Sequence, residues 1–138
     1  MLLLTETQKQ TLFKNYEVQE LIGEGPLSEV YRAVVRSDGS VVAIKLMDKR
    51  ILVRNRKVKA IYREKDAYIR LAGCPNVVQL RETMQDEDTV YFVMDFVPYG
   101  DLRSYVLEHE VSEDTARNIV KGIYAALQCI HIHGYAHR

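Results

Sequence analysis

The sequence predicts an α+β fold in which a strand-rich first two-thirds of the chain is followed by helices. Short segments rich in β-branched and aromatic residues recur through the first part, and a single helical segment interrupts them. After Pro98 and Gly100 the apolar residues instead recur every three or four positions, as on an amphipathic helix. We therefore expect one sheet-rich lobe followed by the start of a helical lobe.

Three strands are predicted first. They are expected at Tyr16–Ile22, Glu29–Val35 and Val41–Met47, the last of which is an almost unbroken apolar run. Between the second and third strands, Ser37–Ser40 predicts a hairpin turn, with Gly39 where a positive φ is needed.

A helix is predicted next, because the apolar period changes. Its apolar stripe consists of Val58, Ile61, Tyr68 and Leu71, so the helix is expected over Val58–Leu71. Gly73 and Pro75 should end it. Two further strands, Val77–Met84 and Thr89–Met94, are expected on either side of a polar turn at Gln85–Asp88.

The remaining segment predicts two helices. A short one is expected near Leu102–Leu107, and a long one should begin after Ser112 as its N-cap. Gly134 should follow the end of the long helix. The apolar stripe of that helix is Ala116, Ile119, Val120, Ile123, Leu127 and Ile130.

Composition places the chain among globular proteins. It has 138 residues, 47% hydrophobic and 28% charged, with 19 basic and 19 acidic side chains, which excludes general disorder. The absence of repeats and linkers predicts one domain. The apolar run Leu2–Leu4 is too short for a signal sequence or membrane span. With no CxxC pair, Cys74 and Cys129 predict reduced, buried thiols, and we expect a cytoplasmic protein.

Charge is unevenly distributed along the chain. Eight basic residues and one acid lie in Lys49–Lys65, and ten acids and one arginine lie in Glu82–Asp114. The basic run lacks interleaved aromatic residues and any nucleic-acid motif, so a solvated helix face is expected and no nucleic-acid partner.

The histidines do not predict a metal site. They are His109, His131, His133 and His137, three of them at the end of the long helix. We find no acidic or cysteine ligand at suitable spacing, and therefore expect no bound metal.

Two features carry candidate chemistry. Gly23–Val30 is a glycine-containing turn after a strand, which suits phosphate binding but also a plain hairpin. A Rossmann loop would have to open a helix, and the segment that follows reads as a strand. Lys45 lies in an apolar strand and needs an anion, and Glu64 interrupts the apolar face of the predicted helix. A Lys45–Glu64 ion pair is predicted, either as a structural bridge or to direct Lys45 toward phosphates.

These residues resemble the protein kinase family. Gly23-x-Gly25-x-x-Ser28-x-Val30 is similar to its glycine-rich loop, Val42–Lys45 to its lysine motif, and Glu64 to the glutamate of its αC helix. The resemblance implies a kinase N-lobe, a five-stranded antiparallel sheet plus the αC helix, followed by the first helices of the C-lobe. It implies an N-terminal extension at 1–15 and an incomplete kinase domain at 16–138. Within that domain we expect an N-lobe at about 16–94, a hinge at about 95–100 and a C-lobe start at about 101–138.

The resemblance also implies an ATP site and serine/threonine kinase activity on a protein substrate. Met94 would be the gatekeeper, Asp95 and Val97 would offer backbone groups to adenine, and Asp101 would contact ribose. The full implied set is Ile22, Gly23, Glu24, Gly25, Ser28, Val30, Ala43, Lys45, Glu64, Met94, Asp95, Val97 and Asp101.

Two departures from the family pattern accompany that implication. Pro26 removes one backbone N–H from the glycine-rich turn. His137 and Arg138 match the start of the catalytic loop, but its Asp and the Mg²⁺ ligands are not among the 138 residues. We therefore expect no activity from the chain alone. A non-catalytic module that docks a hydrophobic phosphopeptide is the alternative.

Within the kinases, Lys49–Asn55 and Arg63–Asp66 resemble the AGC group, most closely its phosphoinositide-dependent branch. A polo-like or calcium/calmodulin-type kinase is the competing assignment. The AGC likeness implies a docking groove for a hydrophobic, often phosphorylated peptide. Its residues would be Lys49, Leu52, Val53, Val58, Ile61, Lys65, Thr83, Gln85 and Val90.

Overall fold

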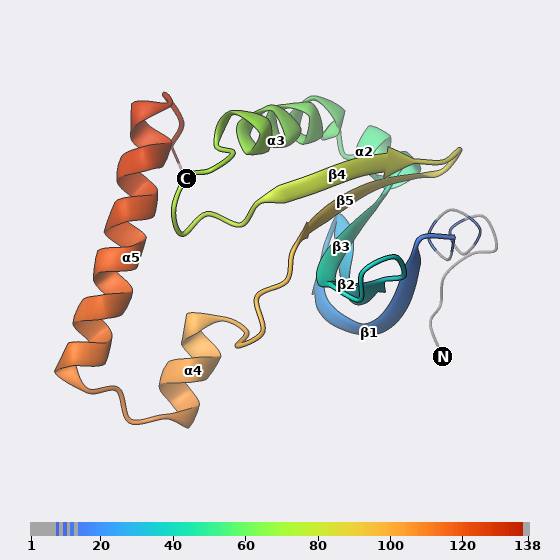
Figure 1. The fold of residues 1–138 in the computed structure, drawn as a ribbon. Coiled ribbons are helices and arrows are strands. Elements are labelled where there is room, and N and C mark those ends of the chain that lie inside the picture. The colour runs from blue at the N-terminus through green and yellow to red at the C-terminus, as the bar shows by residue number, and fades with distance from the viewer. Residues whose placement is uncertain (1–7, 9, 11, 13, 137–138) are drawn as a thin grey trace.

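A computed structural model describes residues 8, 10, 12 and 14–136 of the chain (Figure 1). In chain order the elements are β1 (Tyr16–Gly25), β2 (Ser28–Val35), β3 (Val41–Asp48), α2 (Lys49–Arg54), α3 (Val58–Arg70), β4 (Leu80–Gln85), β5 (Thr89–Asp95), α4 (Leu102–Glu108) and α5 (Glu113–Ile132).

The five strands form one antiparallel sheet in the order β1-β2-β3-β5-β4. The predicted α+β class and five-stranded sheet are therefore confirmed. α3 lies beside the sheet, and β5 leads away from it through an extended segment to α4 and α5 (Figure 1).

Side chains alternate between the two faces of the sheet along each strand, and at the centre of the sheet both faces are buried. On one face, Val42, Ile44 and Leu46 of β3 share a core with Tyr91 and Val93 of β5. Leu12, which is 0% exposed, joins this core from the segment before β1.

The opposite face carries a second, smaller core. Met47, Leu52, Phe92 and Met94 form it, and Ile61 and Tyr68 of α3 pack against it. Because Ala43, Lys45 and Met47 are alternate residues of β3, Lys45 points to this same face, toward α3.

The fold differs from the sequence prediction in three main features. β1 continues through Gly25 as far as the turn, because Gly23 and Gly25 pair with Val30 and Ser28 of β2. β4 begins at Leu80 rather than at Val77.

The third difference is α2, which was not predicted. Asp48 caps this helix by accepting hydrogen bonds from the backbone N–H groups of Arg50 at 2.6 Å and Ile51 at 3.1 Å. Arg56, with a φ of 56°, lies between α2 and α3. The left-handed backbone at Arg56 separates the basic run into two helices.

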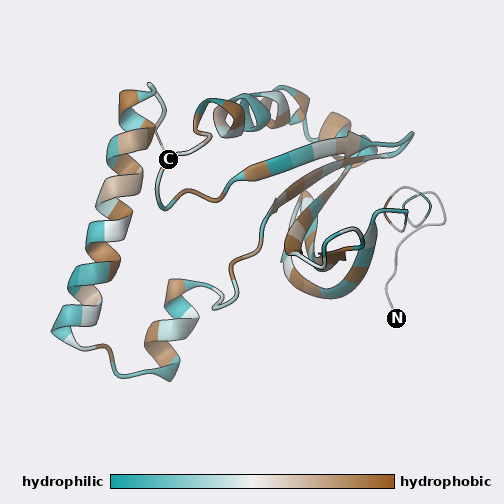
Figure 2. Cartoon of the chain, viewed as in Figure 1, coloured by the Kyte–Doolittle hydropathy of each residue, from teal (hydrophilic) through white to brown (hydrophobic). Residues whose placement is uncertain are grey.

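The helical segment follows the predicted caps. Ser112 caps α5 by accepting a hydrogen bond from the Thr115 backbone N–H at 3.2 Å, and Gly134 after the helix has a φ of 79°. Along α5, apolar and polar residues alternate around the helix (Figure 2). None of its residues is fully buried. Among the described residues, no helix combines the length and apolarity that crossing a bilayer requires.

Candidate functional site

The predicted ion pair between Lys45 and Glu64 is present. The Lys45 Nζ lies 2.7 Å from the Glu64 Oε1, and the two side chains are 21% and 32% exposed. β3 supplies the lysine and the middle of α3 supplies the carboxylate. The pair therefore bridges sheet and helix in a partly desolvated place, where a charge-assisted hydrogen bond is stronger than in water.

Strand pairing places other predicted residues beside Lys45. Gly23 pairs with Val30, and Val30 pairs in turn with Lys45. Ala43 pairs with Met94. Because directly paired residues share one face of a sheet, these five residues line one surface, with an apolar floor and a single ammonium.

The glycines of the β1–β2 hairpin keep that surface open. A Cβ added at Gly23 would lie 3.6 Å from the Val30 Cβ, and one added at Gly25 would lie 3.8 Å from the Ser28 backbone oxygen. These are ordinary contacts, so the glycines are not demanded by packing inside the hairpin. Their lack of side chains leaves the backbone accessible above Lys45, as close approach by a ligand requires. Pro26 occupies the turn.

The residues after β5 have other partners. The Asp95 backbone N–H donates to the Gln79 carbonyl at 3.0 Å, and the Asp95 carboxylate pairs with the Arg81 Nε at 2.8 Å. Asp101 caps α4 and accepts from the Ser104 backbone N–H at 2.9 Å, which holds the pKa of Asp101 below its ordinary value. The side chains of Asp95 and Asp101 thus have structural roles beside the ones that the resemblance implies.

Glu64 has an aromatic neighbour on the same helix. Burial, and secondarily the Glu64 carboxylate, raise the pKa of Tyr68, so its phenol stays protonated. Tyr68 also meets Phe92 edge to face, with 6.3 Å between ring centroids. These contacts position the helix turn that carries Glu64.

A second surface gathers all nine residues of the predicted docking groove. They line one cavity of about 430 Å³ between α2, α3, β4 and β5. The Lys49 Nζ donates to the Asp86 carbonyl at the edge of this cavity. The other basic residues of Lys49–Lys65 are mostly exposed, as expected for a solvated face, whereas Lys49 and Lys65 are half-buried in the groove.

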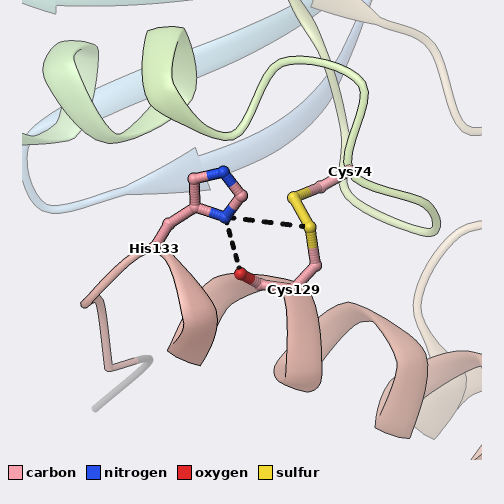
Figure 3. A group of neighbouring side chains, drawn as sticks. All are labelled: Cys74, Cys129 and His133. Carbon is pink, nitrogen blue, oxygen red and sulfur yellow. Dashed lines mark hydrogen bonds between the residues drawn. A yellow bond between two sulfur atoms is a disulfide. The ribbon is translucent and has the colours of Figure 1, made fainter.

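The prediction of two unpaired cysteines is wrong. Cys74 and Cys129, 55 residues apart, form a disulfide with their Cα atoms 6.0 Å apart. His133 lies beside them, and possible ligand atoms of all three residues lie within 4.8 Å of one another (Figure 3). The expectation that no cysteine lies at suitable spacing to a histidine is also wrong, because Cys129 and His133 are one helical turn apart. That i, i+4 spacing was the signal that sequence reasoning missed.

Two other histidines of the sequence are His109 and His137. The His109 Nδ1 contacts the Tyr105 carbonyl at 3.0 Å, and its ring stacks on Tyr105 with centroids 4.6 Å apart. His109 thus has a local structural role. His137 and Arg138, matched to the catalytic loop, lie outside the described residues.

Comparisons with known proteins identify relatives of this arrangement. The protein kinase domain family matches residues 16–138. CBL-interacting protein kinase 5 of Oryza sativa subsp. japonica is 34% identical over 133 residues, which are 96% of this chain and 29% of that protein. Serine/threonine-protein kinase RAD53 of Saccharomyces cerevisiae is 33% identical over 132 residues, 94% of this chain and 16% of that protein. This chain thus spans less than a third of the length of either relative.

A solved structure agrees with these relatives. The crystal structure of Rad53 1-466 in complex with AMP-PNP superposes with a TM-score of 0.84 and 33% sequence identity, covering 91% of this chain and 33% of that one. The relatives do not support the expected AGC assignment, because CBL-interacting kinases belong to the calcium/calmodulin-dependent group. They are serine/threonine kinases, and the non-catalytic alternative has no support among them.

Proposed function

Because this chain belongs to the protein kinase family, we propose that it is the ATP-binding part of a serine/threonine protein kinase, which transfers the γ-phosphoryl group to a protein hydroxyl. The observation that carries the proposal is the Lys45–Glu64 ion pair, at 2.7 Å between sheet and helix. The pair holds an ammonium at a fixed place on an otherwise apolar surface.

The adenine and the phosphates of ATP would each have a matching feature on that surface. Adenine would pack against an apolar surface formed by Val30, Ala43 and Met94. Lys45 is placed to contact the α- and β-phosphates, since an ammonium with a fixed orientation binds phosphate without the cost of ordering a free side chain. The open backbone at Gly23 and Gly25 allows the phosphates to approach.

The named relatives support this assignment. The Rad53 structure holds AMP-PNP, an ATP analogue, and is 33% identical to this chain. Mg²⁺ would neutralise phosphate charge in the complete site. Its ligands and the catalytic Asp belong, by the family pattern, to the segment after His137 and Arg138. We therefore expect these 138 residues to bind nucleotide without turning it over. We also propose that the protein belongs to the calcium/calmodulin-dependent group of kinases, as the CBL-interacting relatives do, and that it is located in the cytoplasm.

Calorimetric titration of the 138-residue chain with ATP and Mg²⁺ tests nucleotide binding. Lys45→Met should weaken binding at least about tenfold, because losing one charge-assisted contact costs about 1.5 to 3 kcal/mol. Glu64→Gln should weaken it less, because Lys45 remains but is no longer oriented. Lys121→Met removes an exposed lysine of α5 and should change nothing. Equal affinity in wild type and Lys45→Met would disprove the assignment.

We further propose that the 430 Å³ groove of the same chain docks a peptide with aromatic anchors and a phosphate. Leu52, Val90 and Phe92 give it an apolar floor, and Lys65 and Lys49 provide positive charge at its edge. An apolar groove with cationic edges matches amphipathic acidic peptides. The relatives do not support an AGC kinase, so the groove itself is the ground for this proposal.

Fluorescence anisotropy with a labelled peptide carrying two phenylalanines and one phosphoserine tests the groove. Ile61→Glu and Lys65→Ala should each weaken binding. Lys59→Ala is the matched control, because Lys59 is an exposed lysine of the same helix outside the groove. Random single-stranded DNA should bind weakly and lose affinity steeply with salt. Tight DNA binding at physiological salt without peptide binding would contradict the proposal.

A further inference from the structure

The loop after α3 meets the last turn of α5 at one covalent bond. Cys74 comes from the loop, Cys129 comes from α5, and His133 follows α5 as its C-cap (Figure 3). We propose that these three residues form a redox-active site, at which a peroxide oxidises the two thiols to a disulfide and a small dithiol reduces it again. The bond would tie α3 to α5 in one state only. The thiol chemistry stands independently of the proposed function, and only its effect on nucleotide binding rests on that function.

The backbone presents the two cysteines in a defined position. Their Cα atoms lie 6.0 Å apart, within the ordinary range of disulfides. The Gln79 side chain organises the loop that carries Cys74: it accepts from the Gly73 N–H at 2.7 Å and donates to the Val77 carbonyl at 2.6 Å. The loop that carries Cys74 is therefore held by hydrogen bonds that do not depend on the disulfide.

Accessibility assigns different roles to the two sulfurs. Cys74 is 6% exposed, whereas Cys129 is half-buried. A reagent from solvent thus reaches Cys129 first. The Cys129 thiol loses its proton, its thiolate attacks one oxygen of the peroxide, and the O–O bond breaks. The leaving oxygen takes up a proton in place of the one that the thiol released, so the products are Cys129 sulfenic acid and an alcohol or water. The Cys74 thiol then attacks the sulfenic sulfur, the S–O bond breaks, and one water leaves as the disulfide forms.

His133 is placed to support the thiolate of Cys129. Its Nδ1 lies 2.8 Å from the Cys129 carbonyl oxygen and 4.0 Å from the Cys129 sulfur. A carbonyl oxygen only accepts, so the Nδ1 at that distance carries the proton. The C-terminal end of a helix disfavours a negative charge such as the Cys129 thiolate. The Nδ1–H of His133, which lies beside the Cys129 carbonyl and sulfur, offsets that effect.

The same geometry argues against a metal at these residues. In the tautomer that the hydrogen bond to the Cys129 carbonyl requires, the His133 Nδ1 carries a proton and has no lone pair to offer a metal. Among the described residues, the group offers three ligands rather than the four of a closed structural zinc site. Thiol chemistry uses the arrangement as it stands.

An apolar cavity also lies between the two helices that the bond connects. The cavity measures about 890 Å³, with Glu64, Tyr68 and Leu71 on the α3 side and Ile119, Ile123 and Leu127 on the α5 side. Noncovalent contacts across it include the Tyr135 hydroxyl, which donates to the Asp66 Oδ2 at 2.7 Å, and the Asn76 side chain near Gly122. α3 has no fully buried residue. Breaking the disulfide would therefore loosen α3, and with it the position of Glu64 opposite Lys45.

Titration of the reduced 138-residue chain with hydrogen peroxide tests the chemistry. We expect two titratable thiols to fall to none, with a mass loss of two hydrogens in the monomer and full recovery with dithiothreitol. Cys74→Ser should leave a sulfenic acid at Cys129 that dimedone traps. Cys129→Ser should react slowly, because Cys74 is buried. In the reduced chain, His133→Gln should alkylate at Cys129 roughly fivefold more slowly, with an unchanged midpoint of thermal unfolding.

Other results would overturn the proposal. These are oxidation that only links separate chains, addition of oxygen without an internal disulfide, or stoichiometric binding of Zn²⁺ alone by the reduced chain that blocks oxidation. ATP affinity measured in both states then tests the coupling, for which severalfold tighter binding by the oxidised chain is expected. Equal, measurable affinity in both states would overturn the coupling. Absence of ATP binding in both states, with normal thiol cycling, would refute the proposed function and leave the redox site standing.

Discussion

Lys45 and Glu64 show how burial sets the strength of an ion pair. At 21% and 32% exposure they lie between the surface pairs that contribute about 0 to 1 kcal/mol and the buried pairs whose disruption costs about 3 to 5 kcal/mol. A coupling free energy of about 1 to 2 kcal/mol is therefore expected. A double-mutant cycle with Lys45→Met and Glu64→Gln, measured by urea unfolding, gives this value.

A second pair in the molecule serves as the control. The Arg50 Nη2 and the Asp88 Oδ1 are also 2.7 Å apart, but their side chains are 80% and 45% exposed. The distance is equal, so the two pairs differ in burial and in residue type but not in separation. The cycle for this pair should give no more than about 0.5 kcal/mol. Equal coupling in both pairs would show that burial does not strengthen the Lys45–Glu64 bridge.

Tyr31 predicts how the chain responds to alkali. Burial, and then its hydrogen bond to Glu29 at 2.8 Å, raise the pKa of Tyr31 to about 12. Between about pH 10 and 12 the unfolded chain releases this proton and the folded chain retains it, so folding stability falls as pH rises. Below about pH 10 the contribution of this group to stability is fully present and does not change with pH. Tyr31→Phe should flatten the fall by an amount on the order of 2 kcal/mol, measured by urea unfolding at pH 9 and pH 11.5.

The control for this prediction is Tyr62→Phe, because Tyr62 is 72% exposed on α3. That substitution should leave the pH dependence unchanged. An identical alkaline slope in wild type and Tyr31→Phe would mean that Tyr31 titrates alike in the folded and unfolded chains.

At the scale of elements, α2 depends on its cap. Six residues form too short a helix to be stable by propensity, and Asp48 satisfies two of its backbone N–H groups. Asp48→Ala should lower the free energy of unfolding by about 1 kcal/mol, whereas Asp48→Asn should retain most of it. Thermal unfolding of both variants checks this. If the alanine and asparagine variants unfold alike, the cap is not what stabilises α2.

The elements also show what the sequence could predict. Segments rich in β-branched, aromatic and other apolar residues, separated by turn residues, were sufficient to predict the five strands, because side chains such as Val42, Ile44 and Leu46 fill the core of the sheet. α2 was not predicted because Leu52 is its only buried residue, so its sequence lacks the helical spacing of apolar residues that predicts a helix. The end of β1 was missed because glycines read as a turn, while pairing across the sheet holds Gly23 and Gly25 in the strand.

The candidate site divides in the same way. Lys45 and Glu64 were predictable, because a charge in an apolar strand and a charge on an apolar helix face each need a partner. Cys74 and Cys129 were not, because 55 residues separate them and only the packing of α5 against the loop brings them together.

Over the whole molecule, burial is concentrated in the sheet. Tyr91 and Phe92 are at most 1% exposed, whereas α3 and α5 contain no fully buried residue. Two bonds connect the buried sheet to the more exposed helices. The Lys45–Glu64 ion pair joins the sheet to α3, and the Cys74–Cys129 disulfide joins the loop after α3 to α5. α3 is therefore held by its packing on the sheet through Ile61 and Tyr68 together with the Lys45–Glu64 pair, whereas α5 is joined to the loop after α3 by the disulfide.

The exposed apolar face of α5 predicts association. Val120, Ile123 and Tyr124 are 63%, 47% and 67% exposed, and their spacing of three and four residues places them next to one another on α5, where they form an apolar patch. Burying such a patch against a second copy removes apolar surface from water, which stabilises the associated state by about 25 cal/mol per Å².

Sedimentation velocity of the oxidised 138-residue chain at increasing concentration should show a shift from monomer to larger species. Val120→Lys combined with Tyr124→Lys should restore the monomer, because two charges in the patch would have to be desolvated on association. Ile69→Lys is the matched control, since Ile69 is 58% exposed on α3, away from the patch, and its substitution should leave association unchanged. A monodisperse monomer at all concentrations would show that α5 does not drive contact between copies, and association that the Ile69 variant abolished equally would place the contact on α3 instead.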